Sequence, residues 1–234
     1  AWQSLRVVDL IEKRYAHPGL NLTDLGRDGI VKSGGELGFD DEIEGVRDGL
    51  PSLFETQVVA LADRIAEAVH DFDDGLQSGA IDLAQAERLD TLVRLRKKLG
   101  TSYPTRGGRF MKINAIHRGL IHMLVTGAVL ASGRALSRWA ERHGVDSPGT
   151  FGEVRDEKVG GSEVQPGAAG QRMLAEIESF LGSRVRRGRT ADQVQLRGRH
   201  VMLGLFAAYL SQPLLLDDHV LLRYKELAGV PFLR

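Results

Sequence analysis

The chain has 234 residues, with 31 basic side chains balanced by 31 acidic ones, and it contains no cysteine. The hydrophobic fraction of 42% is enough for a sizeable core, and the length fits one large domain or one and a half. The balanced charge excludes a global bias toward nucleic acid or anionic membranes, and the missing cysteine excludes disulfide frameworks and cysteine-ligated zinc. A reducing cytosol is the compartment that this composition favours.

Glu-, Arg- and Leu-rich segments alternate along the chain, and clusters of β-branched residues are few, which predicts an all-α protein. No apolar run is expected to reach the roughly 18–20 residues of a membrane span. The amino-terminal segment AWQSLRVVDLIEKR is amphipathic from its start and has no signal-peptide pattern. We therefore expect a cytoplasmic protein without membrane contact.

Two short helices are predicted at the start of the chain. The first covers residues 4–15 and ends at a His-Pro-Gly sequence, and the second begins after Thr23 as its N-cap and runs through Val31. Residues 33–50 are rich in glycine and acidic side chains. This composition predicts a loop that could cover a pocket.

A long helix is predicted next, from Pro51 to either Gly75 or Gly79. Asp82 is the candidate N-cap of a following helix over residues 83–99, where leucine and alanine recur at helical spacing.

In the second half of the chain, one long helix is predicted over residues 109–142. This helix contains glycines at positions 119, 127 and 133. A glycine inside a helix costs about 1 kcal/mol unless another element packs closely there, so these positions predict close helix contacts. Residues 144–170 are rich in glycine and predict a long loop. The remaining predicted helices cover residues 171–186, 190–211 and 217–227.

Residues 57–75 (QVVALADRIAEAVHDFDDG) hold the most informative pattern in the chain. Acidic and histidine side chains recur there at i, i+4, i+7, i+8 and i+11, within about 100° of arc on one helix face. They are Asp63, Glu67, His70, Asp71 and Asp74. The other faces are apolar, which predicts a largely buried helix whose acidic stripe lines a cavity, since buried carboxylates need a partner or a metal. An ordinary amphipathic helix with a solvated acidic face is the alternative.

Residues 52–79 resemble the last metal-ligand helix of the HD-superfamily deoxynucleoside triphosphate triphosphohydrolases, the dGTPase-like enzymes. The most specific part runs from Ala62-Asp63 to Asp73-Asp74-Gly75. Other segments resemble the same family in the same order, at residues 3–15, 18–23, 28–33, 118–129 and 198–216.

The resemblance implies an all-α, HD-domain-type helical bundle with additional C-terminal helices. Residues 1–100 would form the C-terminal part of the catalytic core, and residues 101–234 a helical region of the same unit. The implied reaction is hydrolysis of dGTP or several dNTPs to deoxynucleoside plus tripolyphosphate. A divalent ion such as Mn²⁺ or Mg²⁺ would polarise the α-phosphate.

Particular residues acquire roles through this resemblance. Asp63 stands where the family places the final aspartate of its metal site, and Asp71 where it places a carboxylate near the sugar 3′-hydroxyl. Gln3 lies in a segment that borders the site. Glu67 replaces a tyrosine that lies near the substrate. On the long helix, His117 with Arg118 could face the nucleotide pocket, and a packed or surface role is the alternative.

The family's other metal ligands, a histidine and a His-Asp pair, would precede Gln3, so the chain resembles the middle and C-terminal part of such an enzyme. Because Glu67 adds negative charge near a triphosphate, a catalytically inactive regulator that binds nucleotides or nucleic acid is the alternative. A structural helical interaction module is a third reading. The family also implies a homo-oligomer, with single-stranded DNA or a dNTP as a possible effector.

A basic cluster, RVRRGR, covers residues 184–189, with Arg197 and Arg199 nearby. It could hold phosphates of a nucleotide or of single-stranded DNA, or it could be a solvated helix end. On the long helix, His117 and His122 are about 140° apart, so they are not expected to share one ion.

Overall fold

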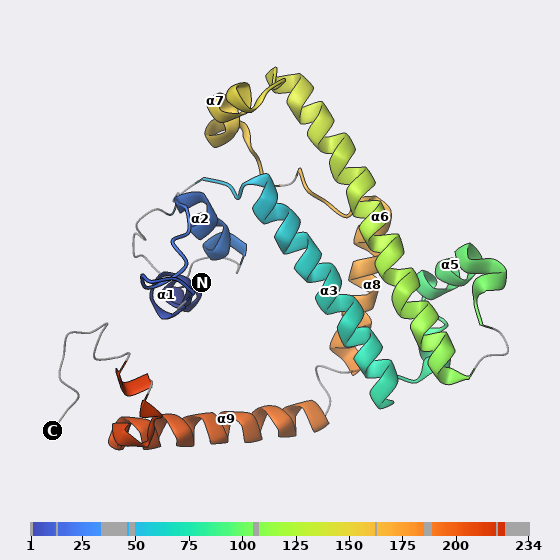
Figure 1. The fold of residues 1–234 in the computed structure, drawn as a ribbon. Helices are drawn as coiled ribbons and strands as arrows, with labels where there is room; N and C mark the ends of the chain where they lie inside the picture. The colour runs from blue at the N-terminus through green and yellow to red at the C-terminus, as the bar shows by residue number, and fades with distance from the viewer. Residues whose placement is uncertain are drawn as a thin grey trace. The chain divides into compact units, whose positions relative to one another are not determined.

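The computed structural model describes residues 2–12, 14–33, 46, 50–104, 108–161, 163–184, 189–218 and 220–222. Every regular element in these ranges is helical (Figure 1), which confirms the all-α prediction. The chain divides into two compact units, Ala1–Arg184 and Val185–Arg234. The boundary at residue 100 that the resemblance implies stays a prediction.

The amino-terminal segment contains α1 (Trp2–Arg6), a π-helical turn η1 (Val7–Ile11) and α2 (Asp24–Ser33). The first predicted helix was too long, because the backbone becomes extended at Glu12. The chain then folds back, and the carbonyls near the helix end accept hydrogen bonds from the amides of Gly19 and Leu20. Thr23 caps α2 as predicted, since its hydroxyl accepts a hydrogen bond from the amide of Gly26 at 3.2 Å.

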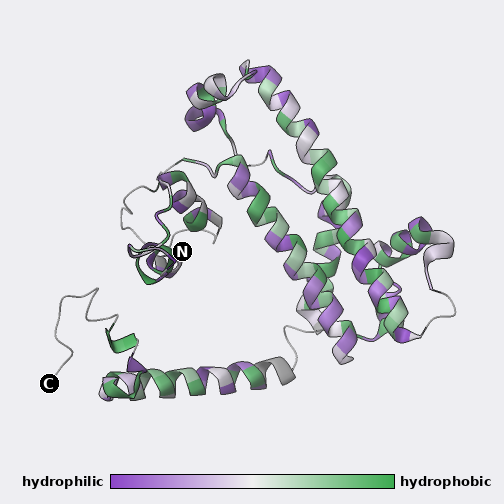
Figure 2. Cartoon of the chain, viewed as in Figure 1, coloured by the Kyte–Doolittle hydropathy of each residue, from purple (hydrophilic) through white to green (hydrophobic). Residues whose placement is uncertain are grey.

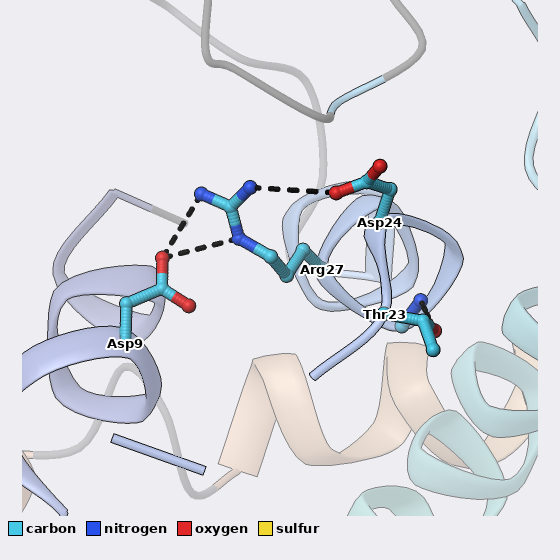
Figure 3. A network of polar contacts seen from close by, with 5 residues as sticks. Asp9, Thr23, Asp24 and Arg27 are labelled. Carbon is cyan, nitrogen blue, oxygen red and sulfur yellow. Dashed lines mark hydrogen bonds and ion pairs between the residues drawn. The ribbon is translucent and has the colours of Figure 1, made fainter. Parts of the chain in front are cut away.

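Arg27 joins η1 to α2 (Figure 3). Its Nε and Nη2 donate to Oδ2 of Asp9 at 3.1 and 3.0 Å, and its Nη1 lies 3.9 Å from Asp24. One guanidinium between two carboxylates therefore fixes the short segment that carries Gln3 against α2.

Three long helices build the core of the first unit: α3 (Phe54–Ser78), α6 (Arg109–His143) and α8 (Gly167–Arg184), which pack against one another (Figure 1). The largest fully buried side chains on these helices are Phe72, Leu76, Ile116, Leu120, Leu124, Leu174, Ile177 and Leu181. Each such side chain contributes roughly 1.5–3 kcal/mol through burial. Helix α3 ends at Gly79, which has φ of +79° as a left-handed C-cap requires.

The single helix predicted over residues 83–99 is divided into α4 (Leu83–Ala86) and α5 (Asp90–Leu99), and a 3₁₀ turn η2 (Gly100–Ser102) follows. The predicted N-cap Asp82 is confirmed, since it accepts from the amide of Gln85 at 3.2 Å. The break comes at Leu89, whose backbone is extended.

Helix α6 forms over the predicted residues, but its three interior glycines differ in how closely other atoms approach them. A Cβ at Gly119 would collide with the buried side chain of Leu95, so this glycine permits close packing as expected. At Gly127 a Cβ would make only ordinary contact, 3.6 Å from the carbonyl oxygen of Pro166. Among the described residues, no atom beyond the helix's own backbone and the chain neighbours lies within 4 Å of a Cβ placed at Gly133, so the prediction of close contact there is wrong.

Helix α6 is long and apolar enough to cross a membrane by length and composition, so the expectation that no segment would reach that threshold is wrong. In the structure it packs on α3, α5 and α8. Its buried residues form part of the core described above.

The loop predicted over residues 144–170 contains a helix, α7 (Pro148–Lys158). Ser147 and Thr150 form a reciprocal capping box, and Pro148 occupies the first turn, where it needs no backbone hydrogen bond. These start signals outweigh the glycine content of the segment.

The second unit contains α9 (Arg189–Ser211) and a 3₁₀ turn η3 (Pro213–Leu215). Figure 2 shows hydrophobic residues along most of α9. Several are exposed within this unit, among them Val201, Leu203, Phe206 and Leu210, and so are Arg197 and Arg199.

Several predicted features lie outside the described residues. They are residues 185–188 of the basic cluster, most of the loop over 33–50, and residues 223–227 of the last predicted helix.

Candidate functional site

The acidic stripe lies on α3, and among the residues that the structure describes it is mostly exposed. Asp63, Glu67, His70 and Asp74 are exposed and Asp71 is half-buried, so the prediction of a buried stripe is wrong. The reason is that α3 buries the sides that pack on α2, α6 and α8, and the stripe lies on the side that these helices leave open. The amphipathic alternative describes the exposure correctly.

The basic residue beside Asp63 is directed at another helix. Arg64 binds the carboxylate of Glu178 on α8, and its Nη1 lies 3.5 Å from Oε1 of Gln171. Within the described ranges, the carboxylate of Asp63 makes no ion pair. The stripe therefore offers an exposed carboxylate that a cation could bind.

Two histidines meet beside the stripe. The rings of His70 on α3 and His117 on α6 are parallel within 3°, with centroids 5.5 Å apart. Nδ1 of His117 lies 3.8 Å from Oδ2 of Asp73. The sequence patterns did not reveal this contact, because it joins two helices that are separate in the chain.

Gln57 is a further residue that the spacing arguments missed. Its side-chain amide donates to the carbonyls of Ser52 and Gly160 at 2.9 and 2.8 Å, and it accepts from the amide of Val164 at 3.1 Å. The buried Gln57 thus holds Gly160 and Val164 against the start of α3. In the sequence, only one feature pointed to Gln57, which is its position two residues after Glu55 in the E-x-Q run before the stripe.

Gln3 and Arg118 are both exposed, on α1 and α6 respectively. In the part of the chain that the structure describes, no hydrogen bond or ion pair joins either residue to Asp63. Their assignment to the site therefore stays a prediction that rests on the resemblance.

A divalent metal ion in a protein needs several oxygen or nitrogen ligands that converge on one point. Nowhere among them do three histidine, aspartate or glutamate side chains converge in a way that could hold an ion. Asp63 could supply one carboxylate ligand, but this set does not fit a metal by itself.

Comparisons with known proteins identify relatives over most of the chain. A deoxyguanosinetriphosphate triphosphohydrolase-like protein of Nitrosomonas europaea is 33% identical over 231 residues, covering 96% of this chain and 58% of that protein. A protein of the same name from Ralstonia nicotianae is 33% identical, covering 92% of this chain and 54% of its own length. Another, from Thiobacillus denitrificans, is 42% identical over 134 residues, which is 53% of this chain and 34% of that protein.

No family model matches the chain. The chain spans a little over half the length of the first two relatives, and their similarity extends over nearly all of its residues. Together with the helical fold and the Asp63–Asp74 stripe on α3, these matches establish the chain as a relative of the HD-type family of dGTPase-like proteins.

Proposed function

We propose that the protein hydrolyses dGTP or several dNTPs to deoxynucleoside plus tripolyphosphate, with the help of a divalent metal ion. The observation that carries this proposal is the exposed stripe from Asp63 to Asp74, in a chain whose relatives are named for this reaction. The proposal concerns the whole protein, because the chain covers only part of its relatives' length.

The charge of the stripe supports a role for a cation. The stripe itself has four carboxylates within about three turns of α3, and they would repel a triphosphate brought to this face. A bound divalent cation would offset part of that local charge and would give the phosphate oxygens a positive centre to approach. We propose that Asp63 is one ligand of this ion.

We propose that Asp71 accepts a hydrogen bond from the sugar 3′-hydroxyl. Its half-buried position suits a carboxylate with a fixed direction, because a fully solvated side chain would keep more rotamer freedom. Gln3, Glu67 and Arg118 complete the proposed substrate contacts. We further propose a cytoplasmic homo-oligomer in which single-stranded DNA or a dNTP acts as an effector.

A second function is a protein that binds nucleotides or nucleic acid without hydrolysing them. Glu67 favours it, because this exposed acid replaces the tyrosine expected beside the substrate and adds charge that opposes a triphosphate. This alternative predicts binding of dNTP with no release of tripolyphosphate.

Product analysis separates the two functions. The full-length protein is incubated with dGTP and with each other dNTP, with and without Mn²⁺ or Mg²⁺, and the products are separated by anion-exchange chromatography. Metal-dependent release of deoxynucleoside and tripolyphosphate supports the hydrolase.

A parallel thermal-shift measurement with the same ligands detects binding, since a ligand at 100 times its Kd stabilises the folded state by about 2.7 kcal/mol. A thermal shift without product supports the binding protein. The absence of both effects contradicts both functions and favours the structural helical module.

A further inference from the structure

The stacked pair His70–His117 lies beside the acidic stripe and has no assigned role. His70 is exposed, whereas His117 is partly enclosed between α3 and α6, with 27% of its side chain accessible. The parallel rings restrict the imidazole of His70 to the direction that the ring of His117 allows. An exposed histidine without such a neighbour would keep its rotamer freedom.

Asp73 lies beside His117, next to the stacked rings. Its Oδ2 accepts a hydrogen bond from Nε2 of Gln77 at 2.6 Å and lies 3.8 Å from Nδ1 of His117. Oδ1 of Asp73 and Nδ1 of His117 are both buried without a hydrogen-bond partner. Buried polar atoms without partners are costly, so a movement of the His117 ring by about 1 Å toward Asp73 would be favourable.

The helix places His70 close to both carboxylates of the proposed nucleotide site, Asp63 and Asp71. His70 comes seven residues after Asp63, so the two side chains are separated by about 20° around α3 and about 10.5 Å along it. His70 also immediately precedes Asp71. The imidazole is therefore on the metal-ligand side of the stripe and at the level of the proposed sugar contact.

We propose that His70 is a nucleotide-contacting residue next to the deoxyribose, and that His117, which stacks on it, is the residue that positions it. This inference rests on the proposed function, because it names a contact within the same nucleotide site. The ring of His70 has both a hydrogen-bond donor and an acceptor for a sugar hydroxyl. The stack with His117 gives that ring its direction before the nucleotide arrives, which lowers the entropy cost of binding.

Steady-state kinetics of the full-length protein test the proposal. His70→Ala is expected to raise KM for dGTP about tenfold while kcat changes less than about threefold, because the lost contact is equally present in the ground and transition states. His117→Ala is expected to shift KM in the same direction by a smaller factor. His117→Phe keeps a flat ring against His70 and is expected to restore most of the affinity.

His122→Ala is the matched control, since His122 is an exposed histidine on the same helix whose Nδ1 lies 3.5 Å from the hydroxyl of Thr126. It is expected to leave both constants unchanged. An unchanged KM in His70→Ala, or a His117→Phe variant as impaired as His117→Ala, would overturn the proposal.

Proton NMR of the chain itself gives a readout that does not need turnover. The Hε1 resonance of His70 is expected to lie upfield through the ring current of His117, to move downfield in His117→Ala, and to shift when dGTP and Mg²⁺ are added. If the chemical shift of His70 does not change when the nucleotide is added, although other resonances shift, the inference is contradicted. If the wild-type protein binds dGTP through His70 but releases no tripolyphosphate, the proposed hydrolase function is contradicted. The proposed contact between His70 and the nucleotide is then still supported.

Discussion

Arg64 and Glu178 form a two-pronged ion pair between α3 and α8, with Nε to Oε1 at 2.7 Å and Nη2 to Oε2 at 2.9 Å. The pKa of Arg64 is raised above its ordinary value, and the hydrogen bond to Glu178 is the main cause. Partial burial of Arg64 opposes this rise. The pair is next to Asp63 in sequence, so it fixes α3 against α8 at the level of the proposed metal ligand.

Glu178→Gln is expected to lower the free energy of unfolding by about 1 kcal/mol, a modest value because both side chains are roughly one-third exposed and solvent screens the pair. Urea denaturation of the chain measures this difference. The control is Glu153→Gln, a change at an exposed position on α7, which should stay within about 0.5 kcal/mol of wild type. Equal stability of the two variants would show that the pair adds nothing.

Glu176 caps α5 from a different helix. Its carboxylate accepts from the amides of Asp90 and Thr91 at 2.8 Å each, and from the hydroxyl of Thr91 at 2.5 Å. Because Leu89 at the N-cap position supplies no side-chain hydrogen bond, Glu176→Ala is expected to cost about 1–2 kcal/mol. Loss of amide protection at the start of α5 in hydrogen exchange should accompany it, and unchanged exchange there would contradict the capping role.

The two glycines 119 and 133 provide a matched pair of substitutions on α6. Gly119→Ala places a methyl group 3.2 Å from Cδ2 of the buried Leu95 and closer still to Cδ1, so overpacking of about 1–3 kcal/mol is expected to exceed the gain in helix propensity. Gly133→Ala meets no atom within 4 Å and is expected to stabilise by about 0.5–1 kcal/mol. Thermal unfolding of the two variants should give Tm shifts of opposite sign, and shifts of the same sign would disprove the packing described at Leu95.

Because the pKa of Tyr103 is raised, we expect the protein to lose stability in alkali. Burial, followed by its 2.6 Å hydrogen bond to Glu87, raises the pKa of Tyr103 well above its usual range. Above pH of about 10 the unfolded chain releases this proton while the folded chain retains it, so stability falls by up to about 1.4 kcal/mol per pH unit. Tyr103→Phe should remove this part of the slope between pH 9 and 11 in urea titrations, and parallel slopes for variant and wild type would contradict the raised pKa.

Local sequence signals predicted those helices whose ends are set by their own residues. Gly79 supplies the left-handed C-cap of α3, and Thr23 and Asp82 cap the helices that follow them, so these boundaries follow from nearby chemistry. Helix α7 was missed although Ser147 and Pro148 mark its start, because the glycines around it were given more weight.

Features that depend on distant residues could not be predicted in the same way. The break before α5 depends on Glu176, which lies 86 residues after Asp90, and the His70–His117 stack joins two helices. The exposure of the acidic stripe likewise depends on which helices pack on α3, and periodicity within α3 does not contain that information. Family resemblance supplied the roles of Asp63 and Asp71, which spacing alone could not assign.

The most direct test of the proposed function is tripolyphosphate release by the full-length protein with Asp63→Asn, measured with dGTP and Mn²⁺. The substitution keeps the size of an exposed side chain and removes the charge that a metal ligand needs, so the fold should stay intact while turnover falls at least about a hundredfold. Glu153→Gln serves again as the control and should retain wild-type turnover. Undiminished, metal-dependent release of tripolyphosphate by Asp63→Asn would contradict the account.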